Sequence, residues 1–221
     1  SAKVGGPHIT GPANANAAKF LTDFLKHCES GENAATGGIG APLDFIAFHA
    51  KGAPRFIDGV VRMNMGTQLR QIDRGFAIVS SNQKYCHLPV IIGECDPEGC
   101  AACGMTQYPQ NGYRNGTMYS SYTASSFAKI HDLALEYGIN LLGVVTWAFE
   151  FEDQPWFHGF RDLATNGVDK PVLNVFRMLG MMGPVRLEAV SDGGLTWKNV
   201  IESGVRSDRT EVGVLASKGD Q

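Results

Sequence analysis

Several features are missing from this 221-residue sequence, and each absence excludes a class of protein. No apolar run approaches the roughly 18 residues that a transmembrane helix needs. Residues 1–6 (SAKVGG) lack the charged and apolar regions of a signal peptide. Neither charge is in excess, since 19 Lys and Arg face 22 Asp and Glu and leave a net charge of −3. The sequence therefore predicts neither membrane insertion nor binding to nucleic acid or an anionic membrane surface.

Nucleotide motifs and a disulfide framework are also missing. Neither GxGxxG nor GxxxxGK[ST] follows an expected strand, which weakens a nucleotide-binding function, and we expect no cofactor. Five cysteines are few and odd in number for this length. Such a set fits free thiols in a reducing compartment better than disulfides. We therefore expect a cytoplasmic protein, with the periplasm as the alternative.

Three of the cysteines nevertheless lie close together in the sequence. Cys95, Cys100 and Cys103 match the spacing of a plant-type iron–sulfur loop, but the fourth, downstream cysteine of that pattern is missing. A zinc site would have to recruit Cys86 or His87, which lie about 25 Å away at the other end of an expected strand. We therefore expect no metal and interpret the three as small apolar residues that pack the loop.

The residues that are present repeat a strand–helix pattern. Hydrophobic residues make up 43% of the chain, enough for a sizeable core. Expected strands begin near Lys3 and cover residues 43–49, 88–94 and 141–147. Expected helices follow them at residues 17–28, 56–79, 119–137 and 171–182. Four such units suit half of a (β/α)8 barrel or a small doubly wound sheet, and the abrupt first strand favours the half barrel.

Local signals support these helices and a change of structure near residue 184. Asn14 suits a helix N-cap, Gly138 a C-terminal stop and Pro171 a first helical turn. Beyond residue 184 the pattern becomes all-β, with alternation at 185–190, a turn at 192–194 and a short strand at 211–216. We expect two domains, a half barrel at 1–183 and part of a β-sandwich at 184–221.

Chemically versatile residues follow the expected strands. Glu94 ends the apolar strand 88–94, His49 follows Phe48 at the end of another, and Trp147 and Glu150 end the last. In a barrel these ends share one rim. An indole is a platform for a sugar ring, His and acids hold hydroxyl groups, and a carboxylate can attack an anomeric carbon. Alternatively, Glu94 caps its loop or pairs with a cation, and His49 and Trp147 are core residues.

Longer motifs carry a family resemblance that covers most of the chain. The sequence resembles glycoside hydrolase family 39, and most closely its proteobacterial β-xylosidase branch. The motifs are VGGP at 4–7, DFIAFHA at 44–50, IIGECDPEGCAAC at 91–103, YRNGTMY at 113–119, LGVVTWAFEFED at 142–153, PWF at 155–157 and KPVLNVF at 170–176.

This resemblance implies a (β/α)8 barrel with an appended β-sandwich, and retaining hydrolysis through two carboxylates. Glu94 matches the nucleophile at the end of the seventh strand, and His49, after the sixth, matches a residue near the bound sugar. Phe48 beside it is a further candidate for substrate binding. The remaining candidates border the pocket after the eighth strand: Trp147, Glu150, Glu152 and Asp153. His8 and Ile9 depart from the small residues that are commoner after the Gly-Gly-Pro.

One family motif is missing. The acid/base glutamate of the family lies in Asn-Glu-Pro at the end of the fourth strand, and these 221 residues contain no such motif. The resemblance therefore implies strands 5–8 of the barrel and the start of the sandwich, with the partner half-barrel upstream. We expect terminal β-xylose of xylo-oligosaccharides as the substrate and no useful activity of this chain alone. The alternatives are a carbohydrate-binding or assembly module without catalysis, and a family 39 enzyme for another sugar.

Overall fold

The centre of the computed structural model is a parallel sheet; residues 2–148, 152–205 and 211–219 are described. The sheet order is β1 (Gly5–Thr10), β2 (Phe45–Lys51), β5 (Val90–Asp96) and β6 (Leu141–Val144). Every neighbouring pair is parallel, and the strands lie in the order in which they occur in the chain. A doubly wound sheet reverses its order at a switch point, whereas a barrel wall does not. The predicted α/β half barrel is confirmed.

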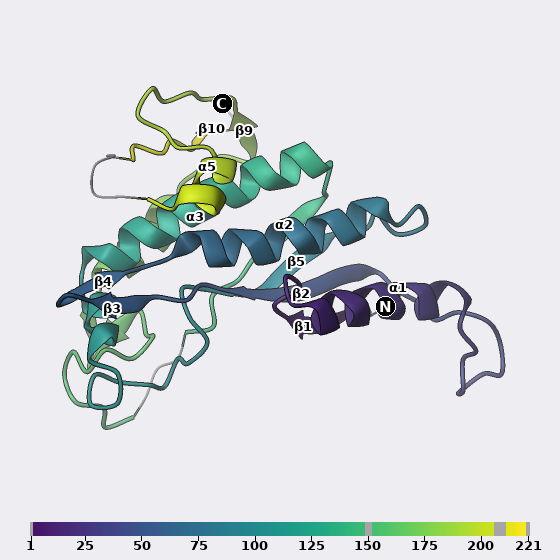
Figure 1. Ribbon diagram of the computed structural model, residues 1–221, viewed down its shortest axis with the longest axis horizontal. Coiled ribbons are helices and arrows are strands. Elements are labelled where there is room, and N and C mark those ends of the chain that lie inside the picture. The colour runs from purple at the N-terminus through teal and green to yellow at the C-terminus, as the bar shows by residue number, and fades with distance from the viewer. Residues whose placement is uncertain (1, 149–151, 206–210, 220–221) are drawn as a thin grey trace.

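Helices connect these strands and cover one face of the sheet. They are α1 (Ala15–Ser30), α2 (Met65–Ser81), α3 (Thr117–Tyr137) and, after β6, α4 (Pro171–Gly180). Figure 1 shows α2 and α3 side by side, with β2 and β5 below them in the view. One core cluster joins helix residues such as Leu69 and Ile130 to the strand residues Ile46 and Ile92. None of the helices in the described ranges is long and apolar enough to cross a membrane.

The helix ends are set by the residues that the sequence indicates. The Asn14 side chain accepts a 2.9 Å hydrogen bond from the backbone N–H of Asn16 and caps α1. Gly138, with φ of 63°, ends α3 in the left-handed conformation that glycine adopts without strain. Pro171 occupies the first turn of α4. These three predictions are confirmed.

A hairpin replaces the first part of the expected helix 56–79. Strands β3 (Arg55–Ile57) and β4 (Val60–Arg62) pair antiparallel, and the helix begins only at Met65. Asp58 and Gly59 connect the strands with φ values of 51° and 76°. An Asp-Gly pair favours such a two-residue turn, and this signal prevails over the helical spacing of the apolar residues. Short elements also flank the later loops: η1 (Pro109–Asn115), β7 (Ala164–Thr165) and β8 (Val168–Asp169).

The C-terminal stretch contains a helix as well as strands. Strands β9 (Val185–Leu187) and β10 (Ala216–Lys218) pair antiparallel, so part of the expected β-structure is present. The all-β prediction is wrong for α5 (Trp197–Ser203), which Thr196 and Asn199 start with a reciprocal capping box. Val200 of α5 is buried in the same core as the sheet. The domain boundary at 183–184 remains a proposal.

Candidate active site

The carboxyl-terminal ends of β2 and β5 bring four ionisable side chains to the sheet face opposite the helices. The register pairs His49 with Glu94 and Lys51 with Asp96. It shifts after the pair Phe48–Ile92, so Gly93 is an extra residue on β5. Without this shift, alternation would turn Glu94 toward the helices. The irregularity at Gly93 therefore places Glu94 on the same face as His49.

Glu94 is held by a cation and an imidazole. Its Oε2 lies 2.6 Å from Lys51 Nζ, and its Oε1 lies 3.4 Å from His49 Nδ1. The Glu94 side chain is 22% exposed, so it is accessible from the open face of the sheet. The Lys51 ammonium attracts the Glu94 carboxylate strongly at this range, because water is partly excluded between them. These two contacts hold the Glu94 side chain in place while leaving it accessible to a substrate.

His49 is the centre of a second set of contacts. Its Nε2 lies 3.1 Å from His8 Nδ1, and its Nδ1 lies 3.3 Å from Thr10 Oγ1. Burial lowers the pKa of His49, and the charges of His8 and Lys51 lower it further, while Glu94 opposes them. His49 is therefore a neutral hydrogen-bonding residue at neutral pH.

Asp96 is fully buried and has partners on every side. Oδ2 lies 2.5 Å from Lys51 Nζ and 3.1 Å from Arg161 Nη1. Oδ1 accepts hydrogen bonds from the Thr146 hydroxyl at 2.6 Å and the Trp147 backbone N–H at 3.1 Å. These contacts fix the strand ends around Asp96, and its complete burial keeps the carboxylate away from a substrate.

Beyond Asp96 the charges continue to alternate. Arg161 Nη1 lies 3.2 Å from Glu98 Oε1, and Arg114 Nη2 lies 2.7 Å from the same oxygen. Burial raises the pKa of Glu98 against the opposing effect of the two guanidinium groups. We call the whole row the charge chain, which runs in the order Glu94, Lys51, Asp96, Arg161, Glu98, Arg114. Among the described residues, no three His, Cys, Asp or Glu side chains gather as metal ligands.

The cysteines differ from the sequence prediction. Cys100 and Cys103 form a disulfide, with Cα atoms 5.4 Å apart, within the usual range for this bond. The expectation that all five are free thiols is therefore wrong, and with it the argument for a cytoplasmic location loses its basis. Cys95 lies on the helix side of β5, where Gln68 Nε2 donates to its sulfur at 3.2 Å and burial raises its pKa. Cys95 therefore faces away from the charge chain.

Arg114 fixes the loop that contains the disulfide. Its guanidinium donates to the carbonyl oxygens of Cys100, Ala101, Cys103 and Gly159 at 2.8 to 3.3 Å. The Tyr113 hydroxyl donates to Glu98 from the same short helix η1. The loop after β5 is thus tied to the buried end of the charge chain.

The other predicted site residues fall in different places. Trp147 lies at the rim, 44% exposed, with its ring centre 5.8 Å from Lys51 Nζ. Glu152 and Asp153 are exposed on the loop after β6, and no hydrogen bond or ion pair within the described ranges joins them to the charge chain. Glu150 lies outside the described residues.

Phe48 is a core residue, and its prediction as a substrate contact is wrong. The side chain is fully buried and packs edge-on against Phe76 of α2, with ring centres 5.9 Å apart. A Cβ atom added to Gly75 would lie 2.6 Å from the Phe48 ring. Adjacent strand residues point to opposite faces, so Phe48 and His49 cannot both face the same pocket.

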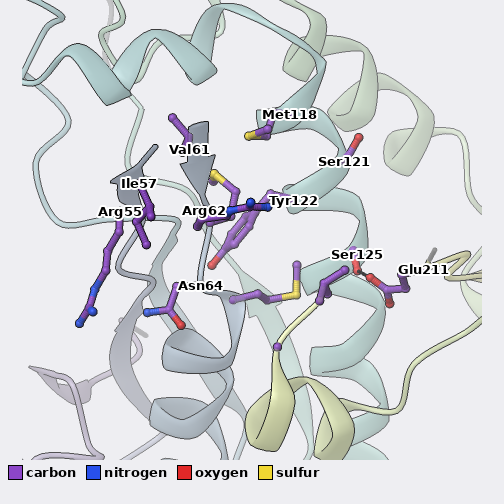
Figure 2. Close-up of a pocket in the computed structure, with 14 residues that line it drawn as sticks. Arg55, Ile57, Val61, Arg62, Asn64, Met118, Ser121, Tyr122, Ser125 and Glu211 are labelled. Carbon is purple, nitrogen blue, oxygen red and sulfur yellow. Dashed lines mark hydrogen bonds between the residues drawn. The ribbon is translucent and has the colours of Figure 1, made fainter. Parts of the chain in front are cut away.

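A cavity of about 670 Å³ lies away from these strand ends. Figure 2 shows Arg62 of the hairpin beside Tyr122 of α3, and Ser125 of the same helix next to Glu211. Its wall also includes Gly204 and Val205, and residues 206–210, which lead from there to Glu211, are outside the described ranges. None of the residues of the charge chain lines this cavity. The strand ends, with a reachable carboxylate, remain the candidate active site.

The fold and site together define a class: half of a (β/α)8 barrel with a carboxylate presented at the carboxyl ends of its strands, as in barrel glycosidases. The family model of the glycosyl hydrolases family 39 matches residues 2–220, and the chain belongs to this family. Among curated proteins, no sequence matches this chain.

A solved structure shares the fold. It is described as the bacterial orthologue of human α-L-iduronidase and aligns at 19% identity with a TM-score of 0.60. The alignment covers 82% of this chain and 30% of the solved chain. At this identity the likeness shows the fold alone. This chain therefore corresponds to less than a third of the related protein.

Proposed function

We propose that the complete protein containing this chain is a retaining glycoside hydrolase with Glu94 as its nucleophile. The observation that carries the proposal is the position of Glu94 at the end of β5, partly exposed and held by Lys51 and His49. Family membership supports glycosidase chemistry in general. The next acids along the chain are Asp96 at the end of β5 and Glu98 in the loop after it, and both are enclosed by cations.

In this proposal the chain supplies one of the two carboxyl groups that retaining hydrolysis needs, the nucleophile. A Glu94 oxygen attacks the anomeric carbon, a glycosyl–enzyme ester forms, and the bond to the leaving oxygen breaks. Lys51 orients the carboxylate and His49 donates to it or to a sugar hydroxyl, while Trp147 offers an apolar platform at the rim. A second carboxyl group about 5–5.5 Å away must protonate the leaving oxygen and then remove a proton from the incoming water.

The acid/base residue is proposed to come from barrel strands that precede this chain. Within the described sheet, β1 and β6 each have a neighbour on one side only, so further strands are needed to close a barrel. The enclosed acids of this half are unsuited to hand over a proton. We therefore expect the isolated chain to hydrolyse no glycoside at a useful rate.

The substrate proposed here is terminal β-xylose of short xylo-oligosaccharides, on the basis of the branch resemblance. The complete protein should release xylose from 4-nitrophenyl β-xyloside faster than it cleaves a matched aryl α-L-iduronide. Proton NMR of the first product should show retained configuration at the anomeric carbon.

The same assay separates the alternatives. Inverted configuration would contradict the nucleophilic role of a carboxylate, because direct attack by water inverts the anomeric carbon. Binding of xylo-oligosaccharides without turnover by the complete protein would favour the non-catalytic module. Turnover by the isolated chain that matches the complete protein would contradict the need for an upstream acid/base residue.

A further inference from the structure

His8 is an exposed residue of β1 with an unusual backbone conformation. The register between β1 and β2 shifts between Pro7 and Ile9, which makes His8 an extra residue, and its φ is 57°. Residues other than glycine rarely adopt this left-handed region, and an extra residue in a strand re-aims its side chain. Ile9 packs against the core of the sheet, whereas His8 contacts His49 on the opposite face. The irregularity thus brings the His8 imidazole to the side of the candidate nucleophile.

The His8 ring lies against the backbone of β5 next to Glu94. A Cβ atom added to Gly93 would lie 2.7 Å from His8 Nδ1 and 2.8 Å from its Cε1. Any larger residue at 93 would displace the ring. The chain therefore has two matched irregularities, at His8 and at Gly93, that let an imidazole fit beside the catalytic carboxylate.

The contacts of His49 indicate which nitrogen of His8 is available. Neutral His49 has one N–H, and its Nδ1 lies 3.4 Å from the carboxylate oxygen of Glu94, which only accepts. With the proton on Nδ1, His49 Nε2 accepts from His8 Nδ1 over 3.1 Å. The His8 Nδ1 is thus engaged by His49, which leaves Nε2 to interact with a ligand. Nε2 belongs to an exposed side chain beside Glu94.

We propose that His8 is a substrate-contacting residue whose Nε2 forms a hydrogen bond with one hydroxyl group of the sugar bound at Glu94. This role rests on the proposed glycosidase function and makes His8 a determinant of sugar specificity. The ligand is a saccharide with a free ring hydroxyl on the β1 side of the pocket. The hydrogen bond to His49 orients the His8 ring for this contact.

Two variants of the complete protein separate contact from packing. His8→Phe keeps an aromatic ring and removes both nitrogens, whereas His8→Asn keeps a donor close to the position of Nδ1 and removes Nε2. Each is assayed on 4-nitrophenyl β-xyloside and on its 2-, 3- and 4-deoxy analogues. Asp58→Ala is the control, because Asp58 also has a positive φ, of 51°, but lies on the exposed β3–β4 turn.

We expect the His8 variants to lose kcat/KM on the parent xyloside but not on one of the deoxy analogues. Both His8 variants should lose about fivefold to tenfold in kcat/KM on the parent xyloside, the usual net contribution of one hydrogen bond. On one deoxy analogue they should equal the wild type, because the hydroxyl that His8 contacts is missing. Asp58→Ala should match the wild type on all four substrates.

Three results would overturn the proposal. An equal loss on the parent and on all deoxy analogues would make His8 a purely structural residue. Unchanged kinetics in both His8 variants would show that His8 does not contact the sugar, while an active wild type would leave the glycosidase function intact. A wild-type protein that hydrolyses no aryl glycoside would overturn both proposals together.

Discussion

The outer part of the charge chain, at Glu94, and its inner part, from Asp96 onward, differ in exposure although Glu94 and Asp96 lie only two residues apart on β5. Glu94 is 22% exposed, whereas the side chains of Asp96 and Arg161 are completely buried. Glu94 has one cation beside it, but Asp96 and Glu98 each lie between two. A buried charge is tolerated only when it is paired, and a completely buried carboxylate cannot contact a substrate. Acids two residues apart on one strand thus have different roles, chemistry at the outer end and structure at the inner end.

The largest expected effect is a loss of activity when Glu94, at the outer end of the charge chain, is replaced. Glu94→Gln in the complete protein should reduce kcat on an aryl xyloside by about 10⁴-fold, because it removes the attacking oxygen. The free energy of unfolding should change by less than about 1 kcal/mol, since Glu94 is partly exposed and Lys51 keeps its contact with Asp96. Initial rates and a denaturant titration measure the two effects. A loss below tenfold would show that the outer end is not catalytic.

The next largest effect is a loss of stability when Arg161, in the buried inner part of the charge chain, is replaced. Arg161→Met should lower the free energy of unfolding by about 3–5 kcal/mol, because Asp96 and Glu98 would keep buried charges with fewer partners. The matched control is Arg186→Met, which breaks an exposed ion pair with Asp132 and should cost less than about 1 kcal/mol. Denaturant titrations of both variants measure the difference. Equal costs would contradict a structural role of the buried end.

A smaller effect is expected from the disulfide loop that adjoins the inner end. Replacing Cys100 and Cys103 by Ser should cost at most about 2 kcal/mol, because the closed loop is very short and Arg114 still holds its carbonyls. Cys86→Ser is the control, since Cys86 is a free thiol. Peptide mapping without reduction should find Cys100 linked to Cys103. Alkylation of both cysteines in the folded, unreduced protein would contradict the bond.

The smallest effect is on the pH dependence of stability, through His49. Its pKa in the folded protein is lowered from 6.5, mainly by burial, so the unfolded chain binds more protons near that pH. The free energy of unfolding should therefore fall as the pH drops below about 6.5, until His49 is protonated in the folded protein. His49→Asn should have a flatter profile between pH 7 and 5. His131, whose pKa is also lowered by burial, remains in both proteins, so identical slopes would exclude His49 as the cause.

Local patterns in the sequence were sufficient to predict the parallel sheet and the accessible part of the candidate site. The strand–helix repeat and the cap residues predict the sheet, and Glu94 and His49 follow from their places at strand ends. Lys51 was missed, although it lies two residues after His49 and alternation puts both on one face. The same rule would have excluded Phe48. Asp96 could have been found in the same way, two residues after Glu94.

The inner end depends on contacts that no local pattern reveals. Arg161 lies 65 positions beyond Asp96, with η1, α3 and β6 between them, and only the folded chain brings the two side chains within 3.1 Å. The shift at Gly93 is equally hidden, because a glycine in a strand marks an irregularity without giving its direction. The disulfide was missed because cysteine counts say little about one short pair in a loop.

The central claim is that Glu94 is the nucleophile of a retaining glycosidase. The most direct test treats the complete protein with a 2-deoxy-2-fluoro xyloside carrying a good leaving group, followed by proteolysis and mass spectrometry. The fluorine slows breakdown of the glycosyl–enzyme ester, so the sugar stays attached. We predict one labelled peptide with the sugar on Glu94, and no label in Glu94→Gln. A label on any other carboxylate, or turnover of substrate without a covalent intermediate, would contradict the claim.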